Sequence, residues 1–233
     1  MTSFPTTRKS PKQRNDIIPG TVVAVGDVHV CYYKLNEILE PYFGTGVELV
    51  FLGDLIDREP IPGHDLKVLK FVKKLHDNPK AYGFSKVTVL KGNHEQYLLR
   101  LKTNPSESFK ELWLYNGGSQ NTLDNCDEYL PWLDSLPVKY IKGKYLFVHA
   151  GVKPNVAIKQ QKVNDLLWIR EDFLSVEDHG LPYVVVHGHT VQESLVPVVT
   201  KHRVSLDLGA CFGGPLGHYE ITPEMYEIPE AVA

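Results

Sequence analysis

The stretch Lys91-Gly-Asn-His-Glu95 decides the fold, because polar side chains of the kind that bind metals follow directly on a short apolar segment. That segment, 87–90, is β-branched and apolar, which is typical of a buried strand. Gly92 is expected to let the backbone turn sharply where the strand ends. Open α/β sheets bind their ligands at the carboxyl ends of their strands. Asn93 and His94 are therefore candidate binding residues.

Four more apolar segments end in the same way, with Asp or His beside Gly. They are 22–25 before Gly26-Asp27-Val28-His29, 48–52 before Gly53-Asp54, 145–148 before His149-Ala150-Gly151, and 183–186 before His187-Gly188-His189. This recurrence predicts a metal site at the ends of the strands. Alternation along the last strand leaves His187 as a competitor of His189, since the two share a side only if the strand stays extended through Gly188.

The candidate ligands differ in what they can do. Asp27 and His29 are two residues apart on an extended loop, so their side chains point the same way and can share a metal. Asp54 can bridge two cations, as carboxylates do in two-metal hydrolases. The other candidates offer an amide oxygen or an imidazole nitrogen: Asn93, His149 and His189.

Length and composition predict one folded domain. The chain has 233 residues, of which 42% are hydrophobic, and we expect a tail that is basic and disordered at 1–18 followed by a single domain at 19–233. A formal charge of −3 provides no basic field, so neither stable nucleic-acid binding nor binding to an anionic membrane is expected. No apolar run approaches the ~20 residues of a membrane-spanning helix, which favours a cytoplasmic protein.

The periodicity of the remaining segments predicts helices between the first strands and mainly strands towards the end of the chain. Helices are expected at 33–39, 66–75 and 96–101, a hairpin at 138–141 and 144–148, and further strands at 196–199, 203–208 and 219–221. This order indicates two sheets packed together with helices outside. Three cysteines without a C-x-x-C pair suggest neither a disulfide framework nor a thiolate zinc site.

The motifs resemble the signature blocks of the phosphoprotein phosphatase (PPP) group of calcineurin-like metallophosphoesterases, and most of all its small phage and bacterial members, typified by bacteriophage lambda protein phosphatase. The blocks are the five quoted above together with Leu55-Ile-Asp57-Arg58, Asn116-Gly117-Gly118, Trp168-Ile-Arg170 and Asp207-Leu-Gly209-Ala210. The resemblance covers about 22–214. It implies a four-layer α/β fold, in which helices sandwich two mixed sheets, and a dimetal centre. For a phage-encoded chain, the location would be the host cytoplasm.

The resemblance also implies a role for each residue. The metal ligands would be Asp27, His29, Asp54, Asn93, His149 and His189, with Asp54 shared between two ions. His94 matches the general acid and Asp57 the carboxylate that orients it. Arg58 and Arg170 match phosphate-binding arginines, whose planar groups hold phosphoryl oxygens bidentately, and Asn93 is assigned to the phosphate as well. Mixed Asp, Asn and His ligation favours two Mn²⁺ ions, with Fe or Zn as alternatives.

The predicted activity is phosphomonoester hydrolysis on phosphoserine and phosphothreonine, with phosphotyrosine as an extension, by attack of a dimetal-bound hydroxide. The alternative is a symmetrical bis(5'-nucleosyl)-tetraphosphatase, whose family shares these blocks. Asp57, Glu95 and the short chain favour the protein phosphatase. A nucleic-acid or cyclic phosphodiesterase, and a scaffold that has lost its activity, are further alternatives that the charge and the complete residue set disfavour.

Two positions depart from the resemblance. Val30 and Glu59 stand where such proteins usually have Gly. Valine resists positive φ, and a carboxylate beside Arg58 would offset part of its charge. We expect an altered substrate preference or rate rather than loss of activity.

Overall fold

The structure is a computed structural model that describes residues 17–59 and 66–226. Most of the predicted tail at 1–18 lies outside these residues, although Ile17 packs against the core. The strands are β1 (Val22–Val25), β2 (Glu48–Phe51), β3 (Lys86–Val89), β4 (Lys139–Lys142), β5 (Tyr145–Val148), β6 (Val184–His187), β7 (Val198–Val199), β8 (Arg203–Ser205) and β9 (His218–Ile221). The α-helices are α1 (Tyr32–Leu39), α2 (Lys67–Asp77), α3 (Asn93–Thr103), α4 (Glu107–Tyr115), α5 (Gln120–Asn125), α6 (Leu130–Ser135), α7 (Val163–Trp168), α8 (Glu171–Leu174) and α9 (Pro223–Tyr226).

The strands form two mixed sheets. The first has the order β3-β2-β1-β9, and the second β4-β5-β6-β8-β7. In the first sheet β1, β2 and β3 are parallel, and in the second β5, β6 and β8 are parallel, while the antiparallel strands β9, β4 and β7 lie at edges. The parallel strands at the centre of each sheet therefore direct their carboxyl ends to the same side of that sheet.

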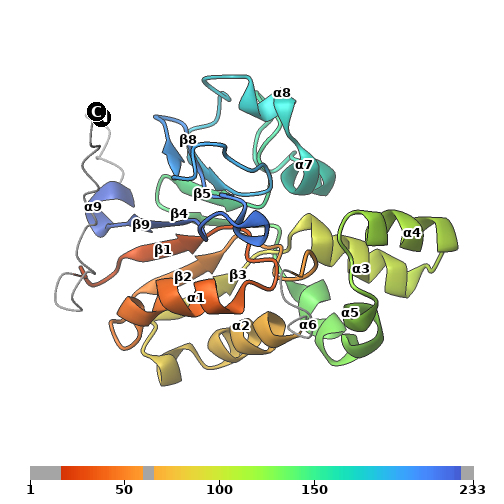
Figure 1. Ribbon diagram of the computed structural model, residues 1–233. Coiled ribbons are helices and arrows are strands. Elements are labelled where there is room, and N and C mark those ends of the chain that lie inside the picture. The colour runs from red at the N-terminus through yellow and green to blue at the C-terminus, as the bar shows by residue number, and fades with distance from the viewer. Residues whose placement is uncertain (1–16, 60–65, 227–233) are drawn as a thin grey trace, which may run out of the picture.

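The sheets pack face to face because central strands such as β1 and β5 are buried and apolar on both sides. Val22 and Ala24 of β1 lie in the cluster between the sheets, whereas Val23 and Val25 face the cluster under α1 and α2. In the second sheet, Phe147 faces the first sheet, and its neighbours along β5 pack against α7 and α8. The result is four layers, helices, sheet, sheet and helices (Figure 1), which confirms the predicted fold class.

Most predicted elements are present, with shifted ends. The helix expected at 96–101 begins at Asn93, so Asn93 and His94 lie in its first turn. The strand expected at 203–208 ends at Ser205, and β7 has only two residues. Helices α7 and α8 lie before the predicted run of strands, in a stretch for which no element was expected. Within 17–59 and 66–226, no helix combines the length and apolarity needed to cross a membrane.

The packing of the two sheets can be tested by shortening one side chain between them. Leu206 is fully buried there, and Leu112 on α4 is 46% exposed. Leu206→Ala should lower the free energy of unfolding by about 2–5 kcal/mol, because it leaves a cavity, while Leu112→Ala should change it far less. Urea unfolding of both variants measures this, and equal effects would contradict the packing described.

Candidate active site

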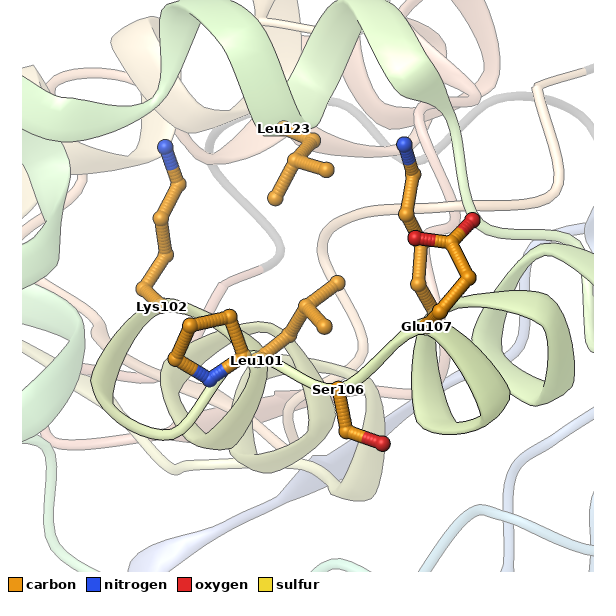
Figure 2. Close-up of a pocket in the computed structure, with 7 residues that line it drawn as sticks. Leu101, Lys102, Ser106, Glu107 and Leu123 are labelled. Atoms are coloured by element: carbon orange, nitrogen blue, oxygen red, sulfur yellow. The ribbon is translucent and has the colours of Figure 1, made fainter.

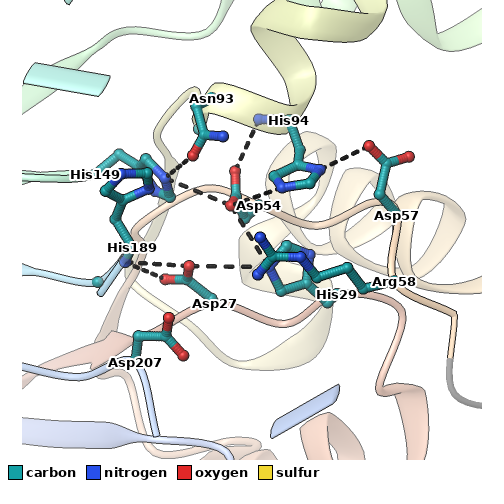
Figure 3. A network of polar contacts seen from close by, with 12 residues as sticks. Asp27, His29, Asp54, Asp57, Arg58, Asn93, His94, His149, His189 and Asp207 are labelled. Carbon is teal, nitrogen blue, oxygen red and sulfur yellow. Dashed lines mark hydrogen bonds and ion pairs between the residues drawn. The ribbon is translucent and has the colours of Figure 1, made fainter. Parts of the chain in front are cut away.

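The six predicted metal ligands converge at the carboxyl ends of five strands, as Figure 3 shows. Each is 5% exposed or less: Asp27, His29, Asp54, Asn93, His149 and His189. The first sheet supplies the first four, from the loops after β1 and β2 and the start of α3. The second sheet supplies the last two, from the ends of β5 and β6. Residues up to 162 positions apart in the chain therefore meet in one buried cluster.

Asp54 lies at the centre of this cluster. One oxygen, Oδ2, is 3.5 Å from His29 Nε2 and 3.5 Å from His149 Nε2. The other, Oδ1, accepts the backbone N–H of His94 at 3.0 Å, which fixes the orientation of the carboxylate. Two groups of metal-binding side chains are close enough to hold an ion, and they share Asp54: Asp54 with His29 and His94, and Asp54 with His149 and His189.

The histidine rings are oriented so that Nε2 faces the cluster. Nδ1 of His29 donates to the Ile56 carbonyl at 2.8 Å, and Nδ1 of His149 donates to the Leu52 carbonyl at 3.0 Å. The backbone of Trp168 opposes the lowering of the pKa of His189 that its burial causes. Backbone carbonyls thus fix the tautomers and leave each Nε2 with a lone pair for a metal.

Two observations indicate that these residues fit divalent cations. Nε2 of His189 is buried and has no hydrogen-bond partner among the described residues. Nε2 of His149 faces Oδ1 of Asn93 at 2.7 Å, although both are acceptors when Nδ1 carries the ring proton. A cation that both atoms ligate would satisfy them. Oxygen and imidazole donors together suit Mn, Fe or Zn.

The pKa shifts of the site have the same main cause throughout, which is burial. Burial, together with repulsion from Asp207 and Asp54, raises the pKa of Asp27 well above its usual range. Burial and repulsion from Glu95 raise the pKa of Asp54. Burial lowers the pKa of His149 to about 3, although its hydrogen bond to the Leu52 carbonyl opposes this. Divalent cations would favour charged carboxylates and neutral imidazoles.

The structure distinguishes His189 from its competitor His187. Both ring nitrogens of His187 lie near protein partners, with Nδ1 3.1 Å from the Gly188 carbonyl and Nε2 2.8 Å from the Ser205 hydroxyl. His187 is therefore a satisfied core histidine, whereas Nε2 of His189 remains available. Gly188 between them lets the chain approach Asp27 closely, since a Cβ there would collide with the Asp27 carboxylate.

His94 and Asp57 form a buried pair beside the predicted metal ligands. Nδ1 of His94 donates to Asp57 Oδ2 at 2.7 Å, so Nε2 points towards Asp54, 3.9 Å away. The indole of Trp113 on α4 donates to the same Asp57 oxygen at 2.8 Å and fixes the carboxylate in place. Burial and the nearby guanidinium of Arg58 lower the pKa of His94 to about 3.

The two predicted phosphate-binding arginines lie on different loops. Arg58 is half-buried, and its Nη1 is 3.2 Å from His29 Nε2. Its backbone N–H donates to the Gly117 carbonyl at 2.7 Å, so the Asn116-Gly-Gly118 turn supports it directly. Arg170 is exposed at the start of α8 and donates to the Thr190 hydroxyl at 3.1 Å. Its charge lowers the pKa values of His149 and His189, which places it beside the second sheet's ligands.

Glu95 has a role that the sequence did not reveal. It is fully buried, and its carboxylate accepts three backbone N–H groups: those of Gly92 at 2.8 Å, Asp54 at 2.9 Å and Leu55 at 2.7 Å. It therefore ties the loop after β2 to the loop after β3.

The predicted sharp turn at Gly92 was wrong, because φ is −94° there. Glycine is needed for space, since a Cβ would collide with Asp54.

Backbone strain is concentrated around the site. Within the described ranges, positive φ outside glycine occurs at eight residues, and six of them lie in or beside the ligand loops: His29, Val30, Asp54, Asp57, Arg58 and His189. Val30 has φ of +55° and is buried, so the conformation expected to be costly for valine is present. Strained residues of this kind persist where the surroundings over-determine the backbone, and they cluster at functional sites.

Asp207 is a site residue that the sequence analysis did not assign. It is buried, follows β8, and raises the pKa of Asp27 by repulsion. Its Oδ1 accepts the Gly209 N–H at 3.0 Å, while Oδ2 has no partner within the part of the chain that the structure describes. A signal was present in the sequence, because Asp207 belongs to the Asp207-Leu-Gly209-Ala210 block, to which no role was assigned.

The comparisons with known proteins agree with this geometry. The sequence profile of the calcineurin-like phosphoesterases matches residues 20–210. The chain belongs to this family. A symmetrical bis(5'-nucleosyl)-tetraphosphatase from Nitrosospira multiformis is 36% identical over 229 residues, which are 90% of this chain and 77% of that protein. Further bacterial relatives with the same name are 28–34% identical, and the chain covers 44–50% of their length.

Solved structures agree on the fold. The crystal structure of a putative diadenosine tetraphosphatase has a TM-score of 0.62 at 21% identity, and the match covers 89% of this chain and 92% of that one. A protein serine/threonine phosphatase from Saccharomyces cerevisiae also has a TM-score of 0.62, at 17% identity, with 91% and 75% covered. The resemblance to the wider superfamily is confirmed. The curated relatives support the tetraphosphatase alternative better than the preferred protein phosphatase.

The assignment of His189 rather than His187 can be tested by metal analysis. Loss of a group that only hydrogen-bonds to a metal ligand typically weakens metal binding about 10–100-fold. His189→Asn should weaken binding of divalent metal at least as much, because it removes a proposed ligand itself. His187→Asn should bind metal as the unchanged protein does. Mn²⁺ content after dialysis, measured by mass spectrometry, decides between them, and loss of metal only in His187→Asn would overturn the assignment.

The role of Glu95 can be tested by replacing its carboxylate with an amide. Glu95→Gln replaces one acceptor oxygen with an NH2 group that cannot accept the backbone N–H groups. It should lower the free energy of unfolding by roughly 1.5–3 kcal/mol. Glu107→Gln on the exposed first turn of α4 is the matched control. Chemical denaturation of the two proteins gives the difference, and a tolerant Glu95→Gln would show that the three hydrogen bonds contribute little.

Proposed function

We propose that the protein is a symmetrical dinucleoside tetraphosphate hydrolase, which cleaves bis(5'-nucleosyl) tetraphosphates into two nucleoside diphosphates. The observation that carries this proposal is the tetraphosphatase of N. multiformis, which is 36% identical over 90% of this chain. The buried cluster supports it, because all predicted ligands, the His94–Asp57 pair and both arginines are present together. A cytoplasmic location remains a prediction.

The proposed ligands would hold two divalent ions that share one carboxylate, with Asp27 and His29 on one side of Asp54 and Asn93, His149 and His189 on the other. Bound there, two such ions, which we expect to be Mn²⁺, would lower the pKa of a water and neutralise charge on the phosphate. The protein's own contribution is to fix these side chains. Their carbonyl partners and the Glu95 carboxylate do so before any substrate arrives.

His94 is proposed as the general acid. Its Nε2 faces the cluster, and its Nδ1–H is held by Asp57, so a proton on Nε2 points to where a leaving oxygen would depart. Asp57 acts through His94 by orienting the ring and favouring its protonated form. Arg58 and Arg170 would bind phosphoryl oxygens from two sides, and Asn93 can offer its amide to the same group.

The reasons that favoured a protein phosphatase lose their weight in the structure. Glu95 holds the backbone of two loops, and Asp57 orients His94, so both residues serve any phosphate ester that enters this site. Membership of the PPP group, with its phage members, remains a prediction. The solved phosphatases are 19% and 17% identical to this chain and resemble it only in fold.

A direct comparison of substrates tests the proposal. With Mn²⁺ supplied, diadenosine tetraphosphate should be converted to ADP with a kcat/KM at least tenfold above that for phosphate release from a phosphoserine peptide. Initial rates, with nucleotide products and free phosphate followed separately, provide the measurement. Rapid turnover of the peptide with an idle dinucleotide would reverse the proposal in favour of the protein phosphatase.

Removal of the proposed acid tests the mechanism. His94→Ala should lower kcat on diadenosine tetraphosphate by about 10²–10⁴-fold, the usual contribution of general acid catalysis, while leaving metal content much less affected than His189→Asn does. His76→Ala on α2, a half-exposed histidine far from the cluster in sequence, is the control. Asp57→Asn should lower kcat in the same direction. Full activity of His94→Ala would exclude this histidine as the acid.

A further inference from the structure

We propose that the cavity between α3 and α7 binds one nucleoside of the dinucleotide, through an aromatic wall formed by Tyr97 and Trp168. The cavity has a volume of about 590 Å³, which is within the range of small-molecule sites. Its lining consists of Gln96, Tyr97, Arg100, Val163, Asn164, Leu167 and Trp168. This inference rests on the proposed function, since it names where that substrate's base would bind.

The cavity adjoins the metal-binding cluster. The Tyr97 ring lies 6.4 Å from the ring of His94, and the Trp168 ring lies 6.0 Å from that of His189, both measured between centroids. Tyr97 and Trp168 contact each other edge-to-face at 4.7 Å. The aromatic wall therefore begins directly behind the proposed acid and one proposed ligand. A nucleotide with its terminal phosphate in the cluster would have its nucleoside beyond the phosphates, on this side.

The chemistry of the lining matches a base better than a peptide. Tyr97 and Trp168 are half-buried, so ring surface remains for stacking, which contributes strongly to nucleobase binding. Gln96 and Asn164 carry amides, each with a donor and an acceptor for the edge of a base. A phosphopeptide would instead need an extended groove with backbone partners. Arg100 lies exposed over the Phe109 ring at 4.4 Å and adds positive charge near an anionic substrate.

A second cavity provides a built-in control. It has a volume of about 430 Å³ and lies between the end of α3, the start of α4 and Leu123 on α5 (Figure 2). Lys102 on its rim is paired with Asp127 at 2.7 Å. The lining of neither cavity includes a residue of the metal-binding cluster, but this second one also lacks any aromatic side chain, whereas Tyr97 and Trp168 of the first contact His94 and His189. A substitution there should therefore leave nucleotide binding unchanged.

The test compares two inhibitors of p-nitrophenyl phosphate hydrolysis, a reaction that requires no nucleoside. With Mn²⁺ in excess, ADP should inhibit more tightly than pyrophosphate, because only ADP reaches the cavity. Tyr97→Leu and Asn164→Ala should raise the inhibition constant of ADP, by roughly 5- to 150-fold for the loss of the stacking surface in Tyr97→Leu. The inhibition constant of pyrophosphate should change by less than a third of that factor. Leu123→Ala should alter neither constant.

The outcomes separate this inference from the proposed function. Equal inhibition by ADP and pyrophosphate in the unchanged protein, or variants that weaken both alike, would overturn the nucleoside site even if diadenosine tetraphosphate is cleaved. Selective loss of ADP inhibition would support the site even if the dinucleotide proves not to be a substrate. Asn164 is exposed on α7, so its variant provides a test in which folding is preserved if Tyr97→Leu disturbs α3.

Discussion

The site depends on one buried carboxylate that never faces a substrate. Glu95 accepts backbone N–H groups from the loop after β2 and from the loop after β3, at distances of 2.7–2.9 Å. Burying a carboxylate is costly unless hydrogen bonds compensate it, and the three bonds here offset part of that cost, although burial still raises the pKa of Glu95. They hold the backbone of Asp54, whose own carboxylate lies between two histidines of different sheets. This tie acts together with the hydrogen bond from the His94 N–H to Asp54 Oδ1 and with the pairing of β2 and β3.

The loops that carry the proposed metal ligands adopt positive φ at several residues that are not glycine. Parallel strands end in line, so a loop must turn back sharply if several side chains are to point at one spot. Asp54 and His189 make that turn without being glycine, with φ of +50° and +65°. Each such residue costs on the order of 1–3 kcal/mol, which the large core between the sheets and under the helices can offset. This strain is the cost of placing residues with functional side chains, rather than glycines, at these turns.

Much of this could be predicted from sequence because the rules involved are local. Apolar runs such as 22–25 and 145–148 predict strands, and the polar residues after them predict the ligands; the structure brings all of these ligands together. What escaped prediction depends on packing between distant segments. The donor that fixes Asp57 comes from Trp113, 56 residues later. Asp207 joins the cluster only because β8 pairs with β6. Glu95 and Asp57 were interpreted as evidence for a protein phosphatase, whereas Glu95 holds two loops and Asp57 contacts His94.

The proposed metal ligands come from both sheets, and this affects the folding free energy of the protein. Four come from the first sheet and two from the second, and the carboxylate of Asp54 adjoins both sets. A cation held by both sets would bind only when the two sheets are packed together, so it would stabilise that packing. By mass action, free metal at 100 times its dissociation constant would add about 2.7 kcal/mol to the folding free energy. The thermal stability of this enzyme would then follow the metal supply of its surroundings.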